Sequence, residues 1–180
     1  MAIFQRRSTA PAVKGNYRQY LRFVREDFSE CCAYCLLHEL LAHGRENFEL
    51  DHFRPQSKFP EFVNDYFNLY YACHVCNLLK HDFWPDNEQE AAGSRFVDFC
   101  RESFSTHFRA TSDGLLFPLT NAAVYTIEKL DLNRPHLVKT RKLLSVLASL
   151  RNATINWDQP SNDQIARLIA LNTGETNGAA

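Results

Sequence analysis

Two Cys-x-x-Cys pairs are the residues most able to do chemistry in this sequence. They are Cys32–Cys35 and Cys73–Cys76, and 37 residues separate the two pairs. Each pair can sit in a tight turn with both sulfurs facing one ion, as a tetrahedral structural zinc site requires. A simple zinc ribbon has only about 15–20 residues between its pairs. The sequence therefore predicts a structural zinc, bound by Cys32, Cys35, Cys73 and Cys76, at the base of a larger segment.

Further polar residues lie inside this segment and directly after it. Asp51 and His52 are adjacent, Asn68 follows later, and Asn77 comes directly after the last cysteine of the second pair. An Asp-His dipeptide is common, and on its own it is more often structural than catalytic. Its position between two cysteine pairs, together with the two asparagines, favours an active site built on the zinc-binding segment.

At these residues the chain resembles the HNH endonucleases, a family with a ββα-metal fold. The resemblance covers about residues 30–82. Asp51-His52 matches the acidic residue and histidine that open the family motif, Asn68 the middle asparagine, and Asn77 the third position. The resemblance implies an α+β chain in which a ββα-metal core with a four-cysteine zinc is flanked by N-terminal and C-terminal helices.

A narrower resemblance concerns the strings Asp51–Lys58 and Cys73–Lys80. They are most similar to the HNH nucleases of Septu-type and retron-linked antiphage systems, which work beside an ATPase. The segment Tyr125–Asn133 and the residues after it resemble the tail of the Septu-type proteins. One departure is His81, because the family often has glycine after the lysine.

The family resemblance implies metal-dependent hydrolysis of phosphodiester bonds. One hard divalent ion, Mg²⁺ or Mn²⁺, neutralises charge at phosphorus and assists the leaving oxygen. Such an ion prefers oxygen ligands, which the Asp51 carboxylate and the Asn77 side-chain carbonyl supply. His52 is then the general base that activates water. Asn68 is expected to hold the ring of His52 or its loop in place.

Several other residues are candidates for supporting roles. His81 lies four residues after Asn77, so it is either a further metal ligand or an exposed histidine at a helix end. Arg54, Lys58 and Lys80 are expected to contact the phosphates of a nucleic acid.

The charge pattern constrains how a nucleic acid could bind. The net charge of −1 is unlike that of most nucleic-acid-binding domains, which are basic. Basic residues are nevertheless concentrated in residues 1–29 and 121–151, which leaves room for a local basic groove. Three arginines share one face of a predicted N-terminal helix, either as a solvated flank or as phosphate contacts: Arg18, Arg22 and Arg25.

No targeting or membrane segment is expected. Arg6-Arg7 is not followed by an apolar run, so a twin-arginine signal is excluded, and no stretch is long and apolar enough to cross a membrane. The sequence therefore predicts a cytoplasmic protein. In that compartment six cysteines favour metal binding over disulfides.

The chain divides into three predicted segments. Residues 1–29 form an arm and a helix over 15–28, residues 30–93 the zinc-stapled HNH core, and residues 94–180 a mainly helical C-terminal subdomain. In the core we expect a strand, a loop, a strand and a short helix, followed by an acidic linker over 82–93.

The C-terminal subdomain is expected to hold four elements and a disordered tail. They are a helix around Phe96–Phe104, a strand at Leu115–Pro118, a helix capped by Asn133, and a last helix opened by a capping box at residues 161–164. Residues 172–180 form the tail. The leucine stripe from Leu137 to Leu150 either docks a partner or packs on the nuclease core.

Two classes of function remain after this reasoning. The favoured interpretation is a metal-dependent HNH endonuclease acting on DNA, as the effector of an antiphage defence system with an ATPase partner. The alternative is a non-catalytic zinc-binding adaptor for nucleic acid or protein. The adaptor gives no reason for Asp51-His52, Asn68 and Asn77 to occur together.

Overall fold

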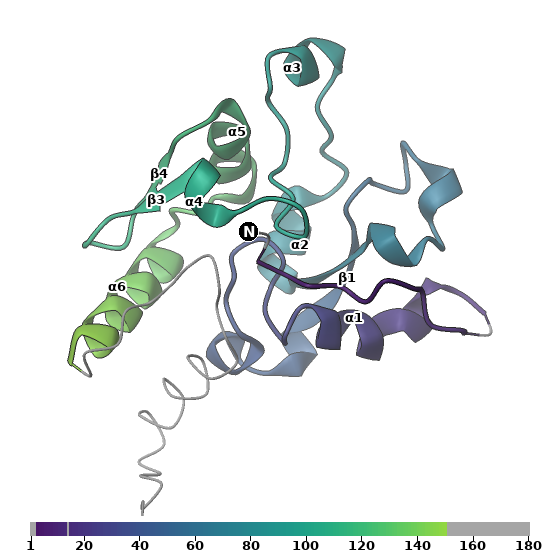
Figure 1. Cartoon of the computed structure of the whole chain (residues 1–180), viewed down its shortest axis with the longest axis horizontal. Helices are drawn as coiled ribbons and strands as arrows, with labels where there is room; N and C mark the ends of the chain where they lie inside the picture. Colours follow the sequence, from purple (N-terminus) through teal and green to yellow (C-terminus); the bar gives the residue numbers. More distant parts are fainter. Residues whose placement is uncertain (1–2, 14, 151–180) are drawn as a thin grey trace, which may run out of the picture.

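The computed structural model describes residues 3–13 and 15–150. The capping box expected at residues 161–164 and the expected tail at 172–180 lie outside this range. The fold combines short helices with two small antiparallel sheets, so the expected α+β class is confirmed (Figure 1). Within the described ranges, no helix combines the length and the apolar character that a membrane span needs.

A two-stranded hairpin and one helix position the polar residues of the central segment. Strand β1 (Phe48–His52) pairs antiparallel with β2 (Leu69–Cys73), with His52 opposite Leu69 and Phe48 opposite Cys73. Helix α2 (His74–Lys80) follows β2 directly. This is the predicted order of strand, loop, strand and helix. Every residue of β2 is buried, so this strand is covered on both faces.

The N-terminal segment packs across this core. The expected helix over 15–28 is present as a 3₁₀ turn followed by α1 (Leu21–Asp27). The amide of Ile3 donates a 2.9 Å hydrogen bond to the carbonyl of Phe99, and the buried ring of Phe4 lies 4.7 Å from that of Phe28. Short 3₁₀ turns connect the elements of this half of the molecule: Tyr17–Tyr20, Glu39–Ala42, Arg45–Asn47, Pro60–Phe62 and Tyr66–Asn68.

The region after α2 differs from the sequence prediction. Residues 82–93, expected as a linker, contain a short helix α3 (Asn87–Ala91), because Asp86 and Gln89 cap it reciprocally. The prediction of a helix around Phe96–Phe104 is wrong. Only α4 (Phe104–His107) is helical there, and the preceding loop instead donates from the amide of Val97 to the hydroxyl of Thr126 at 2.9 Å. Burial of the aromatic side chains, not helical periodicity, explains their spacing.

A second hairpin and two helices complete the described fold. Strands β3 (Phe108–Ala110) and β4 (Leu116–Pro118) pair antiparallel, and β4 falls where the sequence predicted a strand. Helix α5 (Asn121–Leu130), which was not predicted, begins after a Thr120 cap and packs on α2 and β4. Helix α6 runs over Pro135–Leu150.

The prediction that Asn133 caps this helix is wrong. Its side chain accepts from the Leu116 amide at 2.8 Å and donates to the Leu116 carbonyl at 2.9 Å. Asn133 therefore joins β4 to the start of α6 instead of capping the helix.

One hydrophobic core unites the three predicted segments. Its members include Phe4 from the N-terminal arm, Tyr34 from the first cysteine pair, and Leu130 and Leu137 from the last two helices. Leu137 is only 2% exposed, so the leucine stripe begins inside the core and not on a docking surface. The boundaries of the three segments stay a prediction.

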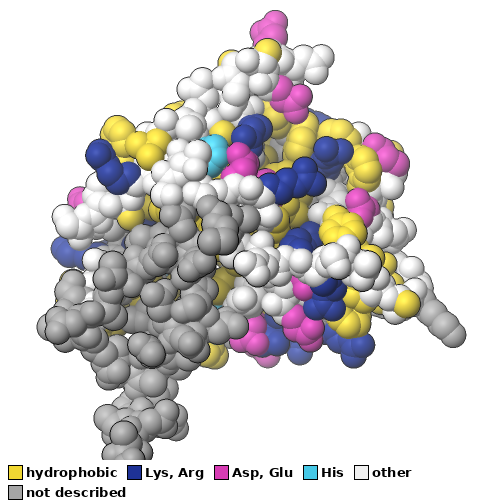
Figure 2. All heavy atoms as spheres, viewed as in Figure 1, with side chains coloured by type: hydrophobic (Ala, Val, Ile, Leu, Met, Phe, Trp, Pro, Cys, Tyr) yellow, Lys and Arg dark blue, Asp and Glu magenta, His cyan; other side chains and the backbone are white. Residues whose placement is uncertain are grey.

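Charges are distributed without one dominant basic patch on the face drawn in Figure 2. There, Lys and Arg side chains are interspersed with acidic and hydrophobic ones. Arg25, one of the three arginines on the N-terminal helix, is paired with Glu39 at 2.5 Å and with Glu30 at 2.9 Å. Its guanidinium therefore has protein partners, as a structural arginine does.

Candidate active site

The four paired cysteines converge on one point. The sulfurs of Cys32, Cys35, Cys73 and Cys76 all lie within 4.8 Å of one another, and those of Cys35 and Cys73 are 3.9 Å apart. Tetrahedral zinc with Zn–S bonds of about 2.3 Å places its sulfurs roughly 3.8 Å apart. The cluster therefore fits the predicted structural zinc.

The surroundings of the cluster also suit a bound cation. Cys32 and Cys76 are fully buried. Burial raises the pKa of the Cys32 thiol well above its usual value. A metal ion binds cysteine as the thiolate, so an ion in the cluster would stabilise the charged form of this buried side chain. The guanidinium of Arg134 donates to the sulfur of Cys76 at 3.3 Å. This arginine adds a compensating charge from the segment between α5 and α6.

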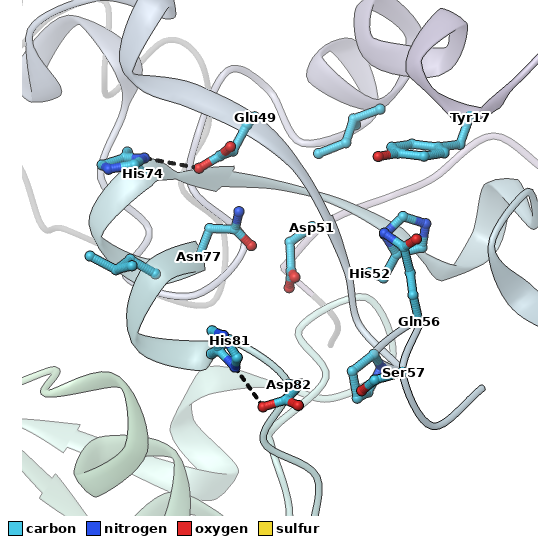
Figure 3. Close-up of a pocket in the computed structure, with 13 residues that line it drawn as sticks. Tyr17, Glu49, Asp51, His52, Gln56, Ser57, His74, Asn77, His81 and Asp82 are labelled. Carbon is cyan, nitrogen blue, oxygen red and sulfur yellow. Dashed lines mark hydrogen bonds and ion pairs between the residues drawn. The ribbon is translucent and has the colours of Figure 1, made fainter. Parts of the chain in front are cut away.

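A cleft of about 570 Å³ opens beside this cluster and contains the Asp-His pair (Figure 3). Asp51 and His52 both line it, although adjacent residues of a regular strand point to opposite faces. Strand β1 ends at His52, and Pro55 follows in the loop. The strand therefore ends where both side chains can reach one cleft.

His52 is held by hydrogen bonds at both ring nitrogens. Its Nε2 lies 2.8 Å from the carbonyl of Val63, and because a carbonyl only accepts, this nitrogen carries the proton. In the neutral ring Nδ1 is then the basic nitrogen, and the side-chain amide of Gln56 donates to it at 2.9 Å. The ring of Tyr17 contacts the imidazole edge-on at 4.6 Å.

Asp51 is buried, and both of its carboxylate oxygens have protein donors. The hydroxyl of Tyr34 donates to Oδ2. The ammonium of Lys80 lies 3.0 Å from Oδ2 and 3.3 Å from Oδ1. Burial raises the pKa of the Asp51 carboxyl, and the charge of Lys80 and the hydrogen bond from Tyr34 partly offset that effect. The carboxylate is thus held in a fixed orientation.

Asn77 presents its side-chain amide to the same cleft. It stands on α2, and its amide points toward Asp51 in Figure 3. No hydrogen bond joins this amide to any residue that the structure describes. A free amide carbonyl beside a carboxylate is the oxygen pair that a hard divalent ion prefers.

His81 lines the cleft at the end of α2 in an unfavourable backbone conformation. Its φ is 46° and its ψ is −130°, a region that glycine adopts freely and other residues rarely do. The exposed imidazole pairs with the carboxylate of Asp82 at 2.5 Å. His81, at the position where the family often has glycine, therefore places an imidazole in the cleft although its backbone conformation is one that suits glycine.

Three of the remaining candidates lie elsewhere. Asn68 does not reach the cleft lining, and its amide accepts from the Arg54 amide at 2.8 Å and donates to the carbonyls of Arg54 and Phe62 at 3.0 and 3.3 Å. Arg54 lines a second, smaller pocket. Lys58 is exposed and donates to the Trp84 carbonyl at 3.3 Å.

Lys80 differs from its expected role. Its side chain is fully buried, and its ammonium also donates to the His52 carbonyl at 2.8 Å. No part of this side chain reaches the protein surface. The prediction that Lys80 contacts a phosphate is therefore wrong. The buried ammonium of Lys80 is instead the counter-ion of Asp51.

Sequence reasoning missed several contacts of this site, among them the side chains of Tyr34 and Gln56. Tyr34 lies within the first cysteine pair, and Gln56 lies four residues after His52. Neither residue type indicates a catalytic role by itself. The position of Gln56 directly after Pro55, and that of Tyr34 between two zinc ligands, were the only signals available.

Comparison with protein families agrees with this geometry. Residues 32–83 match the model of the HNH endonuclease family. The matched range holds both cysteine pairs, the hairpin, α2 and the cleft residues Asp51, His52 and Asn77. No curated protein matches the chain. Residues 32–83 are therefore an HNH domain with four cysteines placed to bind a metal. A domain of this class indicates metal-dependent cleavage of nucleic acid.

Proposed function

We propose that this protein is an endonuclease that hydrolyses DNA phosphodiester bonds in the cleft of its HNH domain. The observation that supports this most strongly is the fixed tautomer of His52. The Val63 carbonyl holds the proton on Nε2, which leaves Nδ1 as the basic nitrogen of a ring that lines the same cleft as Asp51. A neutral imidazole with one unprotonated ring nitrogen can accept a proton from water.

The oxygen ligands for a divalent ion are Asp51 and Asn77. A bound Mg²⁺ or Mn²⁺ supplies charge neutralisation at phosphorus and assistance to the leaving oxygen. His81 is a candidate third ligand because it stands one helical turn after Asn77. Zinc in the four-cysteine cluster has the separate role of holding the hairpin and α2 together.

The proposed reaction moves one proton through His52. The water oxygen bonds to phosphorus while its proton passes to Nδ1, and the bond from phosphorus to the 3′ oxygen breaks. The leaving oxygen takes a proton from solvent. The resulting imidazolium keeps its hydrogen bond to the Val63 carbonyl, whose negative end favours the new charge. Asn68 fixes the loop that carries this carbonyl through its hydrogen bond to Phe62.

The experiment is plasmid cleavage by zinc-loaded protein across a Mg²⁺ titration. Replacing the base in His52→Ala should lower cleavage by about 100–10,000-fold at every Mg²⁺ concentration. Asp51→Ala should also lose activity, but raising Mg²⁺ or supplying Mn²⁺ should restore part of it. His43→Ala is the matched control, because His43 is an exposed histidine outside the cleft.

Three results would contradict the proposal. His52→Ala within about tenfold of wild type would exclude the general base. Equal cleavage in chelator that leaves zinc in place would exclude the divalent-ion mechanism. Cleavage of RNA but not DNA by the wild type would exclude the substrate class.

We also propose that the nuclease acts in antiphage defence beside an ATPase. The support is the resemblance of Asp51–Lys58, Cys73–Lys80 and the Tyr125–Asn133 segment to nucleases of that kind. A net charge of −1 also gives this nuclease little attraction of its own for DNA, so a partner that delivers the substrate would be useful.

We place the surface that would bind the ATPase on exposed residues of α6. Leu143 and Val146 are 56% and 48% exposed, unlike the buried Leu137. Leu143→Glu with Val146→Glu should abolish co-purification with an ATPase encoded by a neighbouring gene while cleavage in its absence stays unchanged. Retained co-purification would exclude this surface.

The alternative, a non-catalytic zinc-binding adaptor, is less well supported. It explains the cysteine cluster but not the unpartnered amide of Asn77 in a cleft with Asp51 and His52. Nucleic-acid binding by the wild type with no cleavage under any divalent ion would favour the adaptor.

A further inference from the structure

Tyr34 stands between two of the four clustered cysteines and is held from several sides. Cys32 and Cys35 flank it in sequence, and the amide of Ala33 donates to the Tyr71 carbonyl on β2 at 2.7 Å. The Tyr34 ring is 2% exposed and stacks on Tyr70 with a centroid distance of 6.3 Å and an interplanar angle of 17°. Its backbone and ring therefore have one defined position once the cysteine pair binds its ion.

The hydroxyl of this tyrosine donates to Oδ2 of Asp51, the oxygen that also accepts from Lys80. These donors hold the carboxylate of Asp51 where it lines the cleft. The group that turns Asp51 toward a divalent ion thus comes from the cysteine pair, 17 residues earlier in the chain. Hydrogen bonds of this kind to a metal ligand commonly set metal affinity, and their loss costs about 10–100-fold.

We propose that Tyr34 is a positioning residue through which the zinc-binding cysteine pair orients Asp51 for the divalent ion. The two metal sites are then coupled, because the backbone that binds zinc also places the donor to Asp51. This inference rests on the proposed role of Asp51 as a ligand of the catalytic ion. It assigns Tyr34 no contact with the substrate or with the reacting atoms.

The test measures Mn²⁺ binding directly, by electron paramagnetic resonance of free Mn²⁺, on zinc-loaded full-length protein without nucleic acid. Tyr34→Phe keeps the ring and removes the hydroxyl, so Mn²⁺ affinity should fall about 10–100-fold while zinc content stays at wild-type level. Tyr70→Phe is the matched control. Its hydroxyl is equally buried but donates to Asp98 at 2.7 Å, so Mn²⁺ affinity should not change.

A merely structural role for the hydroxyl predicts a different result. Both tyrosine variants would then lose similar thermal stability and keep wild-type Mn²⁺ affinity, which would overturn the inference. The double variant Tyr34→Phe/Asp51→Ala gives a second criterion. It should bind Mn²⁺ no more weakly than Asp51→Ala alone, and an additional loss would show that Tyr34 does not act through Asp51.

Failure of the proposed function gives a distinct pattern. If Asp51→Ala binds Mn²⁺ as tightly as wild type, Asp51 is not a ligand, and the assignment of the catalytic ion fails before Tyr34 is considered. If Asp51→Ala loses Mn²⁺ and Tyr34→Phe does not, only the positioning role of Tyr34 is overturned.

Discussion

Gln56 donates a 2.9 Å hydrogen bond to Nδ1 of His52, the nitrogen that the proposed mechanism assigns to proton abstraction. The amide thus occupies the place where an attacking water must bind. In the proposed mechanism, His52 can therefore accept a proton from water only after the side chain of Gln56 has moved away from Nδ1.

The first prediction follows from this contact. Gln56→Ala should raise the rate of DNA cleavage by a few-fold, because a neutral hydrogen bond of roughly 1 kcal/mol no longer competes with water. The measurement is single-turnover cleavage at saturating Mg²⁺, with the exposed Gln19→Ala as control. A tenfold loss would show that the amide orients the water instead of competing with it.

A second prediction concerns the counter-ion of Asp51. Lys80→Met should lower the free energy of unfolding by about 3–5 kcal/mol, because it leaves a buried carboxylate without its partner. Adding Asp51→Asn should recover part of that loss, since the uncompensated charge is then removed. Urea denaturation of the single and double variants, all loaded with zinc, measures the coupling. Strictly additive losses would mean that the two side chains do not stabilise each other.

The backbone of His81 supports a third prediction, in which stability and activity change in opposite directions. His81→Gly should raise the free energy of unfolding by about 1 kcal/mol, because glycine adopts a φ of 46° without strain. Cleavage should nevertheless fall by about tenfold, as expected of a residue in or next to the metal site.

The matched control for this variant is His43→Gly. His43 is also an exposed histidine with positive φ, at 66°, but it lies outside the cleft. It should gain stability and keep full activity. Unchanged cleavage by His81→Gly would remove His81 from the proposed site.

A fourth prediction places Arg134 at the zinc cluster. Removing its guanidinium in Arg134→Ala should weaken zinc retention by about 10–100-fold, because the donor to the Cys76 sulfur is lost. Zinc transfer to a coloured chelator reports the change. Arg101→Ala, at a side chain 81% exposed, should release zinc like wild type. Equal release by both variants would limit Arg134 to a packing role.

The sequence was sufficient to predict the central hairpin and helix, because their signals are local. The two cysteine pairs and the Asp-His and asparagine positions between and after them lie within one short stretch of sequence. The same segment also placed Asp51, His52 and Asn77 in one cleft, since adjacency in sequence and a position directly after a zinc ligand leave little freedom.

Contacts between distant parts of the chain were not predictable in this way. Burial in the shared core produced the aromatic spacing at Phe96 and Phe99 that resembled a helix. Lys80 was expected at a phosphate because it is charged and near the motif, yet its ammonium is paired with Asp51 inside the protein. The hydrogen bond from Tyr34 to Asp51 requires the turn of the first cysteine pair to face β1, and no local sequence pattern indicates that arrangement.

The packing around the first cysteine pair limits how this HNH domain could be transplanted. Tyr34 and Cys35 share one small enclosed space with Leu132 and Arg141, which lie far beyond the HNH match. A graft of residues 32–83 into another protein would expose that side of the four-cysteine cluster to water and to competing thiols. The portable unit therefore extends into α6, and a fusion that is to keep this cluster covered must carry the C-terminal helices as well as the HNH match.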